Sequence, residues 1–165
     1  MCIRDSLEAF TLSDVLLSQG RDLAILTQAE SLESYRPLHE DLQRFAAASY
    51  VVELLDRLTV EAEPQPELFE LLQQTLAALC QTEQIGLLLC YFELHSLAIA
   101  GFQPELQRCV WSGVEIEAVD QFFDLSAGGV VCPAASQQAA QQLTPPALLP
   151  ITVQTLKLLR IIQRS

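Results

Sequence analysis

Basic residues are scarce in this chain of 165 residues, which holds 9 Lys and Arg against 21 Asp and Glu and has a net charge of −12. Nucleic-acid affinity depends mainly on cationic side chains that displace counterions from the phosphates. A chain this negative is therefore not expected to bind DNA as a free-standing domain.

Long apolar runs are also missing. The longest, Ile85 to Ala100, is interrupted by Glu93, His95 and Ser96, and a membrane-spanning helix needs about 20 predominantly apolar residues. No secretory signal opens the sequence. These absences predict a protein that does not span a membrane and that works in the cytoplasm. Half of the residues are hydrophobic, which is enough for a core.

Cysteines are too few for a disulfide scaffold and odd in number, as expected for a reducing compartment. The five are Cys2, Cys80, Cys90, Cys109 and Cys132. Cys80 and Cys90 lie on apolar faces of expected helices, where a thiol packs as a small hydrophobic group. We therefore expect both in the core.

Enzyme signatures are absent: the sequence has no phosphate-binding, dinucleotide-binding, zinc-protease or serine-hydrolase motif. His95 with Glu93 is one arrangement that could act as an acid–base pair, but a buried histidine more often forms a structural hydrogen bond. His39, beside Glu40 and Asp41, is typical of a solvated helical turn. We expect no catalytic residue and no cofactor.

Hydrophobic periodicity predicts a β-hairpin followed by helices. Residues 7–35 alternate with a period near two on either side of a turn at 18–21. Helical spacing follows over about 37–60, 66–80 and 83–100. The third helix is apolar almost all round, which predicts that its neighbours bury it. Gly101 is expected to end it, because glycine readily adopts the left-handed conformation found after helix ends.

Residues 104–136 lose this periodicity and contain two short turns, which we call knuckles. The first is Cys109-x-x-Ser112 and the second is Cys132-x-x-Ala135, with a strand and a turn between them. A structural zinc site needs four ligands, commonly two cysteines from each knuckle. Serine is a poor zinc ligand and alanine is none, so we predict a ribbon-like shape without metal and no stoichiometric zinc.

The last part of the chain is predicted to be helical again. Residues 137–142 are expected to form a short helical segment, and a final helix follows Pro150. Lys157, Arg160 and Arg164 are spaced to share one face of that helix. This face either provides favourable charge at a helix C-terminus or attracts an acidic partner or a phosphate backbone, and the first interpretation is favoured. The other cations are scattered, with Arg21 at the hairpin turn and Arg44 and Arg57 on the first helix.

Several segments occur in the same order as in a known family. They are Gly20-Arg-Asp-Leu, Ile25-Leu-Thr-Gln-Ala-Glu30, Glu40-Asp-Leu, Ala48-Ser-Tyr, Glu53-Leu-Leu-Asp-Arg-Leu58, Phe92 to Phe102, Pro104 to Cys109 and Gly128-Gly-Val-Val-Cys132-Pro. From about residue 7 to its end, the chain resembles the bacterial recombination mediator RecO. The knuckles depart from the family's pattern at Ser112 and Ala135.

The resemblance implies a mainly α fold in which a helical domain follows an OB-fold. Residues 1–6 are expected to be a non-native addition, 7–36 the last part of the OB-fold, and 37–165 the helical domain, with a degenerate zinc-ribbon-like insertion at about 105–136. An OB-fold has about five strands, so its first part is expected to be missing here.

The same resemblance implies a role in DNA repair and recombination. RecO proteins act with RecR, sometimes also with RecF, displace the single-stranded DNA-binding protein SSB so that RecA can load, and anneal strands. We expect this chain to bind the acidic, apolar-tipped tail of SSB but to bind single-stranded DNA only weakly. The alternatives are a helical protein-interaction module with a degenerate zinc ribbon and no repair role, and an enzyme that uses His95.

Overall fold

A computed structural model describes residues 7–20, 23–60, 63–139 and 147–165. They belong to two compact units, 1–89 and 90–165, with the boundary inside one helix. The predicted addition at 1–6, Arg21, and residues 140–142 of the expected short helix lie outside the described residues.

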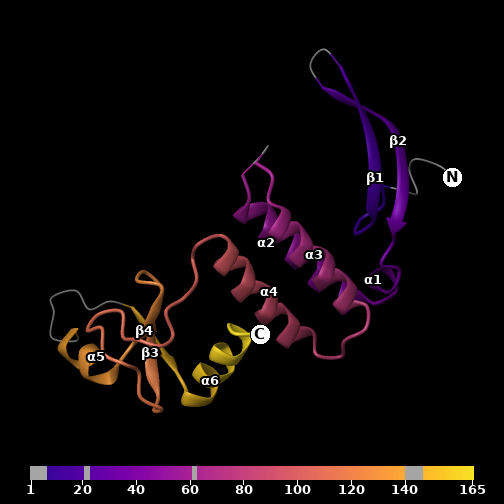
Figure 1. The fold of residues 1–165 in the computed structure, drawn as a ribbon. Coiled ribbons are helices and arrows are strands. Elements are labelled where there is room, and N and C mark those ends of the chain that lie inside the picture. The colour runs from indigo at the N-terminus through magenta and orange to yellow at the C-terminus, as the bar shows by residue number, and fades with distance from the viewer. Residues whose placement is uncertain (1–6, 21–22, 61–62, 140–146) are drawn as a thin grey trace. The chain divides into compact units, whose positions relative to one another are not determined.

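The predicted hairpin is present in the first unit. Strands β1 (Leu12–Gln19) and β2 (Ala24–Glu33) pair in antiparallel fashion, from Leu12 opposite Glu33 to Gln19 opposite Ala24 (Figure 1). Most of their side chains are exposed on both faces. A two-stranded sheet is marginally stable by itself, and this one gains little from a core.

The helix expected over 37–60 is divided in two, so the prediction of one helix was wrong. Helix α1 (Pro37–Glu40) ends at Asp41, whose backbone is extended at φ −128° and ψ 120°. The Asp41 carboxylate then accepts hydrogen bonds from the backbone N–H groups of Gln43 and Arg44, at 2.8 and 3.0 Å. It thereby caps α2 (Leu42–Leu58), as aspartate commonly does at a helix N-terminus.

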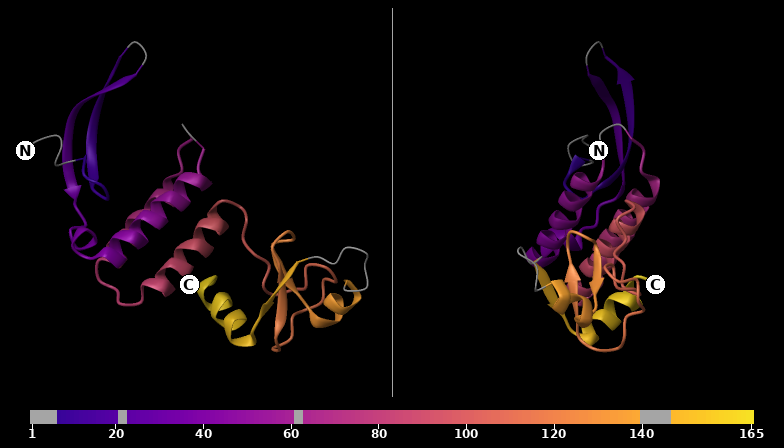
Figure 2. Two further views of the ribbon diagram at one scale, coloured as in Figure 1. Left: turned by 180° about the vertical axis from the view of Figure 1, so that it is seen from behind. Right: turned by 90° about the vertical axis from the view of Figure 1, so that its left-hand side faces the viewer.

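Helix α3 (Pro66–Leu79) lies beside α2, as the two views of Figure 2 show. The core of this unit joins the end of the hairpin to these helices. Its buried members are Tyr35, Leu38, Ala47, Ala48, Leu76 and Leu79. The core therefore lies at the base of the hairpin rather than under its strands.

Helix α4 (Ile85–Ile99) ends as predicted. Gly101 has φ +81°, its N–H donates to Ala98, and the Phe102 N–H donates to Leu97 at 2.7 Å. This pair of bonds is the Schellman pattern of helix ends. The prediction that the helix is buried all round was wrong, because only Phe92 and Ser96 are fully buried among its described residues.

The second unit contains a three-stranded antiparallel sheet. Its strands are β3 (Gln121–Asp124), β4 (Gly129–Val131) and β5 (Leu148–Ile151), in the order β4-β3-β5. Helix α5 (Pro133–Ala139) contacts β3, and α6 (Val153–Ile162) ends the fold. Strand β5 was missed because it contains Pro150, and proline is accepted only at a sheet edge such as this one.

Helices outnumber strands, as expected for a mainly α fold, and the described residues form six helices and two small sheets. The core of the second unit is formed by Leu106, Cys109, Ile116, Val130, Val131, Ala135, Ile151 and Leu156. No helix in the described ranges has both the length and the apolar character needed to cross a bilayer.

Candidate functional site

The two knuckles meet at the end of β4. The backbone N–H of Cys132 donates to Sγ of Cys109 at 3.4 Å, and the Ser112 hydroxyl lies 3.8 Å from Sγ of Cys132. Ala135 belongs to the same buried cluster as Cys109. The structure thus brings together the four positions that the sequence spacing singled out.

Local hydrogen bonds fix the first knuckle. The Gly113 N–H donates to the Cys109 carbonyl and the Cys109 N–H to the Val114 carbonyl, each at 2.8 Å. Gly113 has φ +73°, a conformation that glycine adopts without strain. The Trp111 indole N–H donates to the Asp124 carboxylate at 3.0 Å and so ties the knuckle to the end of β3.

The knuckle also favours a thiolate. Burial raises the pKa of the Cys109 thiol, but the Ser112 hydroxyl and the backbone N–H groups of Cys132, Ser112 and Trp111 outweigh burial and lower this pKa to about 7. These donors favour the charged form because they hydrogen-bond to it. Part of the Cys109 population is therefore thiolate at neutral pH.

The knuckle residues do not fit a zinc ion. They offer two thiols, one hydroxyl and one methyl group, whereas structural zinc takes four sulfur or nitrogen ligands. Within the described ranges, no group of three or more His, Cys, Asp or Glu side chains is placed to hold a metal. Elemental analysis for zinc on the purified protein tests the predicted lack of metal.

His95 makes a structural contact. Its Nε2 lies 3.1 Å from the carbonyl oxygen of Ile162, and its ring lies 4.1 Å from that of Tyr91. Because a carbonyl only accepts hydrogen bonds, Nε2 must carry the proton. Glu93 is two positions away on α4, and residues at that spacing do not face each other on a helix.

The prediction that Cys80 and Cys90 pack in the core was right for Cys80 alone. Cys80 is half-buried, packs against the first core and donates to the Leu76 carbonyl at 3.3 Å. Burial, and secondarily the Glu33 carboxylate, raises the pKa of its thiol. Cys90 is exposed, so the prediction that it packs in the core was wrong. The error follows from the limited burial of α4.

Most described arginines bind groups of this same chain. Arg44 donates to the carbonyl of Leu79, the last residue of α3, and to that of Thr82 just beyond it. Arg57 pairs with Glu53 at 2.6 Å, and Arg36 pairs with Glu40 at 2.8 Å.

The basic face predicted for the last helix is incomplete. Arg160 reaches the Leu106 carbonyl through Nε at 2.9 Å and Nη2 at 2.6 Å. Lys157 and Arg164 are exposed. Arg160 lies in the last turn of α6, in agreement with the favoured interpretation of a cation near a helix C-terminus. The alternative, a three-residue surface for an acidic partner, loses Arg160 to a backbone acceptor.

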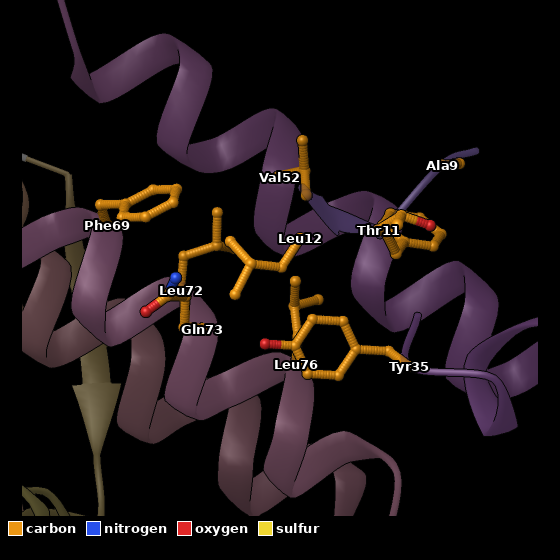
Figure 3. Close-up of a pocket in the computed structure, with 10 residues that line it drawn as sticks. Ala9, Thr11, Leu12, Tyr35, Val52, Phe69, Leu72, Gln73 and Leu76 are labelled. Atoms are coloured by element: carbon orange, nitrogen blue, oxygen red, sulfur yellow. The ribbon is translucent and has the colours of Figure 1, made fainter. Parts of the chain in front are cut away.

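An apolar pocket of about 270 Å³ lies in the first unit, between the start of β1 and helices α2 and α3 (Figure 3). Its lining residues are Ala9, Phe10, Thr11, Leu12, Tyr35, Val52, Phe69, Leu72, Gln73 and Leu76. Phe10 and Tyr35 have positive φ angles, 54° and 41°, which are uncommon for residues with large side chains. The sequence analysis did not predict this pocket. The sequence feature that could have indicated it is the pair of aromatic residues that flank the hairpin, Phe10 before β1 and Tyr35 after β2.

Comparison with known protein families shows the family to which this chain belongs. A family model described as "Recombination protein O C terminal" matches residues 39–165. The chain belongs to the RecO family. The match begins inside α1, after the hairpin, and covers the later helices and the three-stranded sheet.

Individual RecO relatives match more of the chain. Proteins named DNA repair protein RecO are 33% identical over 159 residues in Dehalococcoides mccartyi, 35% over 157 residues in a Roseiflexus species and 40% over 129 residues in Pelotomaculum thermopropionicum. The alignments cover 96%, 95% and 78% of this chain but 60%, 53% and 50% of those proteins. The chain thus spans about half to three-fifths of the length of the curated RecO proteins that it matches.

Proposed function

We propose that this chain is part of a recombination mediator that binds SSB and RecR, helps to load RecA and anneals complementary strands. The match of the RecO C-terminal model to residues 39–165 carries this proposal. Relatives named DNA repair protein RecO support the same role. This family membership favours a repair role over the alternative of an unrelated interaction module.

Within this mediator, the helical part serves partner binding. The pocket is lined mainly by apolar side chains, among them Val52 of α2, and Phe69 and Leu72 of α3. An apolar peptide end gains affinity by burying its side chains in such a site. We propose that the apolar tip of the SSB tail occupies this pocket.

Single-stranded DNA is a weak ligand of this chain in the proposed scheme. Binding of single strands combines a cationic groove with aromatic side chains on which bases stack. Here Arg44 and Arg160 are engaged with backbone carbonyls, and the net charge is −12. We attribute the family's DNA binding to the OB-fold, of which β1 and β2 would be the last strands.

The two knuckles belong to the insertion that the RecO resemblance implies. We interpret residues 105–136 as a zinc-ribbon-like insertion whose metal has been lost. The hydrogen bonds between the knuckles and the core around Leu106 and Val130 support this interpretation. In this scheme apolar packing holds the segment together without an ion.

Fluorescence anisotropy with a labelled SSB tail peptide tests the pocket. Phe69 is 51% exposed, so we expect Phe69→Ala to fold normally and to weaken peptide binding about tenfold, as truncation of a central aromatic contact commonly does. The matched control is Phe102→Ala, because Phe102 is 71% exposed and lies outside the pocket. Equal affinity in all three proteins would exclude this pocket as the site of the tail.

A second titration with an oligo-dT strand, and a pull-down with purified RecR, test the mediator role itself. We expect weak oligo-dT binding that disappears at moderate salt, together with retention of RecR. Absence of binding to both RecR and the SSB peptide would favour the alternative of a module without a repair role. Tight, salt-resistant DNA binding would contradict the proposal that single-stranded DNA is only a weak ligand of this chain.

A further inference from the structure

We propose that Cys132 and Cys109 are a peroxide-sensitive thiol pair that closes a disulfide between the two knuckles. Sγ of Cys109 accepts a hydrogen bond from the backbone N–H of Cys132 at 3.4 Å, so it lies beside the backbone that carries the second thiol. Rotation about the Cα–Cβ bond of Cys132 changes the position of its sulfur relative to Sγ of Cys109, which lies beside the Cys132 amide. The Ser112 hydroxyl also contacts Sγ of Cys132 and hydrogen-bonds to Cys109.

The two sulfurs differ in their access to solvent. Cys109 is only 1% exposed. Cys132 is partly exposed and lines a cavity of about 290 Å³ together with Val114, Val119 and Pro133. A small oxidant such as hydrogen peroxide therefore reaches Cys132 first, and Cys109 is shielded from direct attack.

The reaction proceeds in two balanced steps. The Cys132 thiolate attacks one peroxide oxygen, the O–O bond breaks, and the products are a sulfenic acid on Cys132 and hydroxide. The Cys109 thiolate then attacks the Cys132 sulfur, the S–O bond breaks, and a second hydroxide leaves as the disulfide forms. With two protons from the thiols, the net change converts two thiols and one peroxide into one disulfide and two water molecules.

The protein supports the second step through Cys109. The Ser112 hydroxyl and three backbone N–H groups lower the pKa of Cys109 to about 7 despite its burial. At neutral pH a large share of the resolving sulfur is therefore already the nucleophilic thiolate. The hydrogen bond from Trp111 to Asp124 holds this knuckle against the end of β3, so the resolving group is positioned before oxidation.

Cys90 serves for comparison as an exposed thiol outside the Cys109–Cys132 pair. It is exposed, so peroxide reaches it as well. In the described part of the chain, no hydrogen bond links Cys90 to a second thiol. We therefore expect Cys90 to stop at oxidised or adducted forms without an internal disulfide.

Peptide mapping under non-reducing conditions tests the proposal in the full chain carrying Cys2→Ser and Cys80→Ser. After stoichiometric peroxide we expect a Cys109–Cys132 cross-link that lowers the mass of the fragments carrying these two residues by two hydrogen atoms, with full reversal by dithiothreitol. Dimedone, which traps sulfenic acids, should label Cys132 strongly only when Cys109→Ser is added. Equal dimedone labelling of Cys132 with and without Cys109, and no cross-link, would overturn the proposal.

Ser112→Ala keeps both thiols and separates a resolving role for Cys109 from chance proximity. Loss of the hydroxyl raises the pKa of Cys109, so we expect closure at neutral pH to slow several-fold and the rate to recover at higher pH. Ser126→Ala, which also removes a hydroxyl but from an exposed residue of the same unit outside this cavity, is the matched control. An unchanged rate and pH profile in Ser112→Ala would contradict the proposed role of the Cys109 thiolate.

Discussion

Arg44, on α2, donates through Nη1 to the carbonyl oxygen of Thr82, 2.8 Å away and just beyond the end of α3. The same nitrogen donates to the Leu79 carbonyl, and Nη2 lies 3.2 Å from the Glu83 carboxylate. One half-buried guanidinium thus satisfies the last carbonyl of α3, which has no partner within the helix, and a second carbonyl in the turn that follows.

Arg44→Met is expected to lower the free energy of unfolding by about 2 kcal/mol, because it removes hydrogen bonds from a charged donor and leaves shielded carbonyls without partners. Urea denaturation measures the change. The control is Arg57→Met, whose exposed pair with Glu53 is expected to contribute less than about 1 kcal/mol. An equal decrease in the free energy of unfolding of the two variants would show that the contacts of Arg44 stabilise the fold no more than an exposed ion pair does.

Glu105 is expected to make the stability of the second unit depend on pH. The backbone N–H groups of Gln107 and Arg108 lower the pKa of its carboxylate below the ordinary value of 4.5. The group therefore favours the folded state above pH 4.5, and this contribution is lost as the pH falls through the lowered pKa. Thermal unfolding from neutral to strongly acidic pH should show this loss in the natural chain and not in Glu105→Gln.

Glu117→Gln removes the same charge from an exposed site and is the control for the Glu105 experiment. Its acid dependence should follow that of the natural chain. If Glu105→Gln also follows the natural chain, the two backbone hydrogen bonds do not contribute to acid sensitivity.

Gly129→Ala is expected to destabilise the second unit. A Cβ at this position would lie 2.4 Å from the Val110 side chain and 2.8 Å from the Glu105 carbonyl oxygen. Such overpacking typically costs about 1–3 kcal/mol, and here it would also separate β4 from the Glu105 backbone that bridges to it. Thermal unfolding, with Ala134→Ser as the exposed control, measures this effect, and an unchanged melting temperature would contradict the close approach.

Local sequence signals predicted the parts of this fold that local physics controls. The alternation before and after the turn identified the hairpin, and Gly101 identified the end of α4. Both features depend on the conformational preferences of neighbouring residues. The Cys109 knuckle was likewise predicted, because its own backbone closes it. The second knuckle is instead the first turn of α5, which begins at Pro133 and not at 137 as predicted. Hydrogen bonds between residues far apart in the sequence bring the two segments together.

Features that depend on distant partners were not predictable in this way. Cys90 lies on a helix apolar enough to be buried, yet burial requires neighbours that cover every face. Arg160 has the spacing of a basic surface, but the Leu106 carbonyl, far away in the sequence, accepts its guanidinium. The break at Asp41 was missed because the hydrophobic spacing continues across it, although an aspartate is a common helix cap.

The two small sheets differ in how their edges are closed to further strands. In the second unit, the Glu105 backbone bridges to β4 at Gly129, and β5 on the opposite edge carries Pro150, which has no N–H to donate. In the first unit, β1 and β2 pair only with each other among the described residues, and Leu16 and Ile25 are exposed. Open, apolar edges are where chains add to one another and aggregate. At high concentration the hairpin is therefore the place where intermolecular strand pairing should begin, and the small sheet of the second unit should take no part in it.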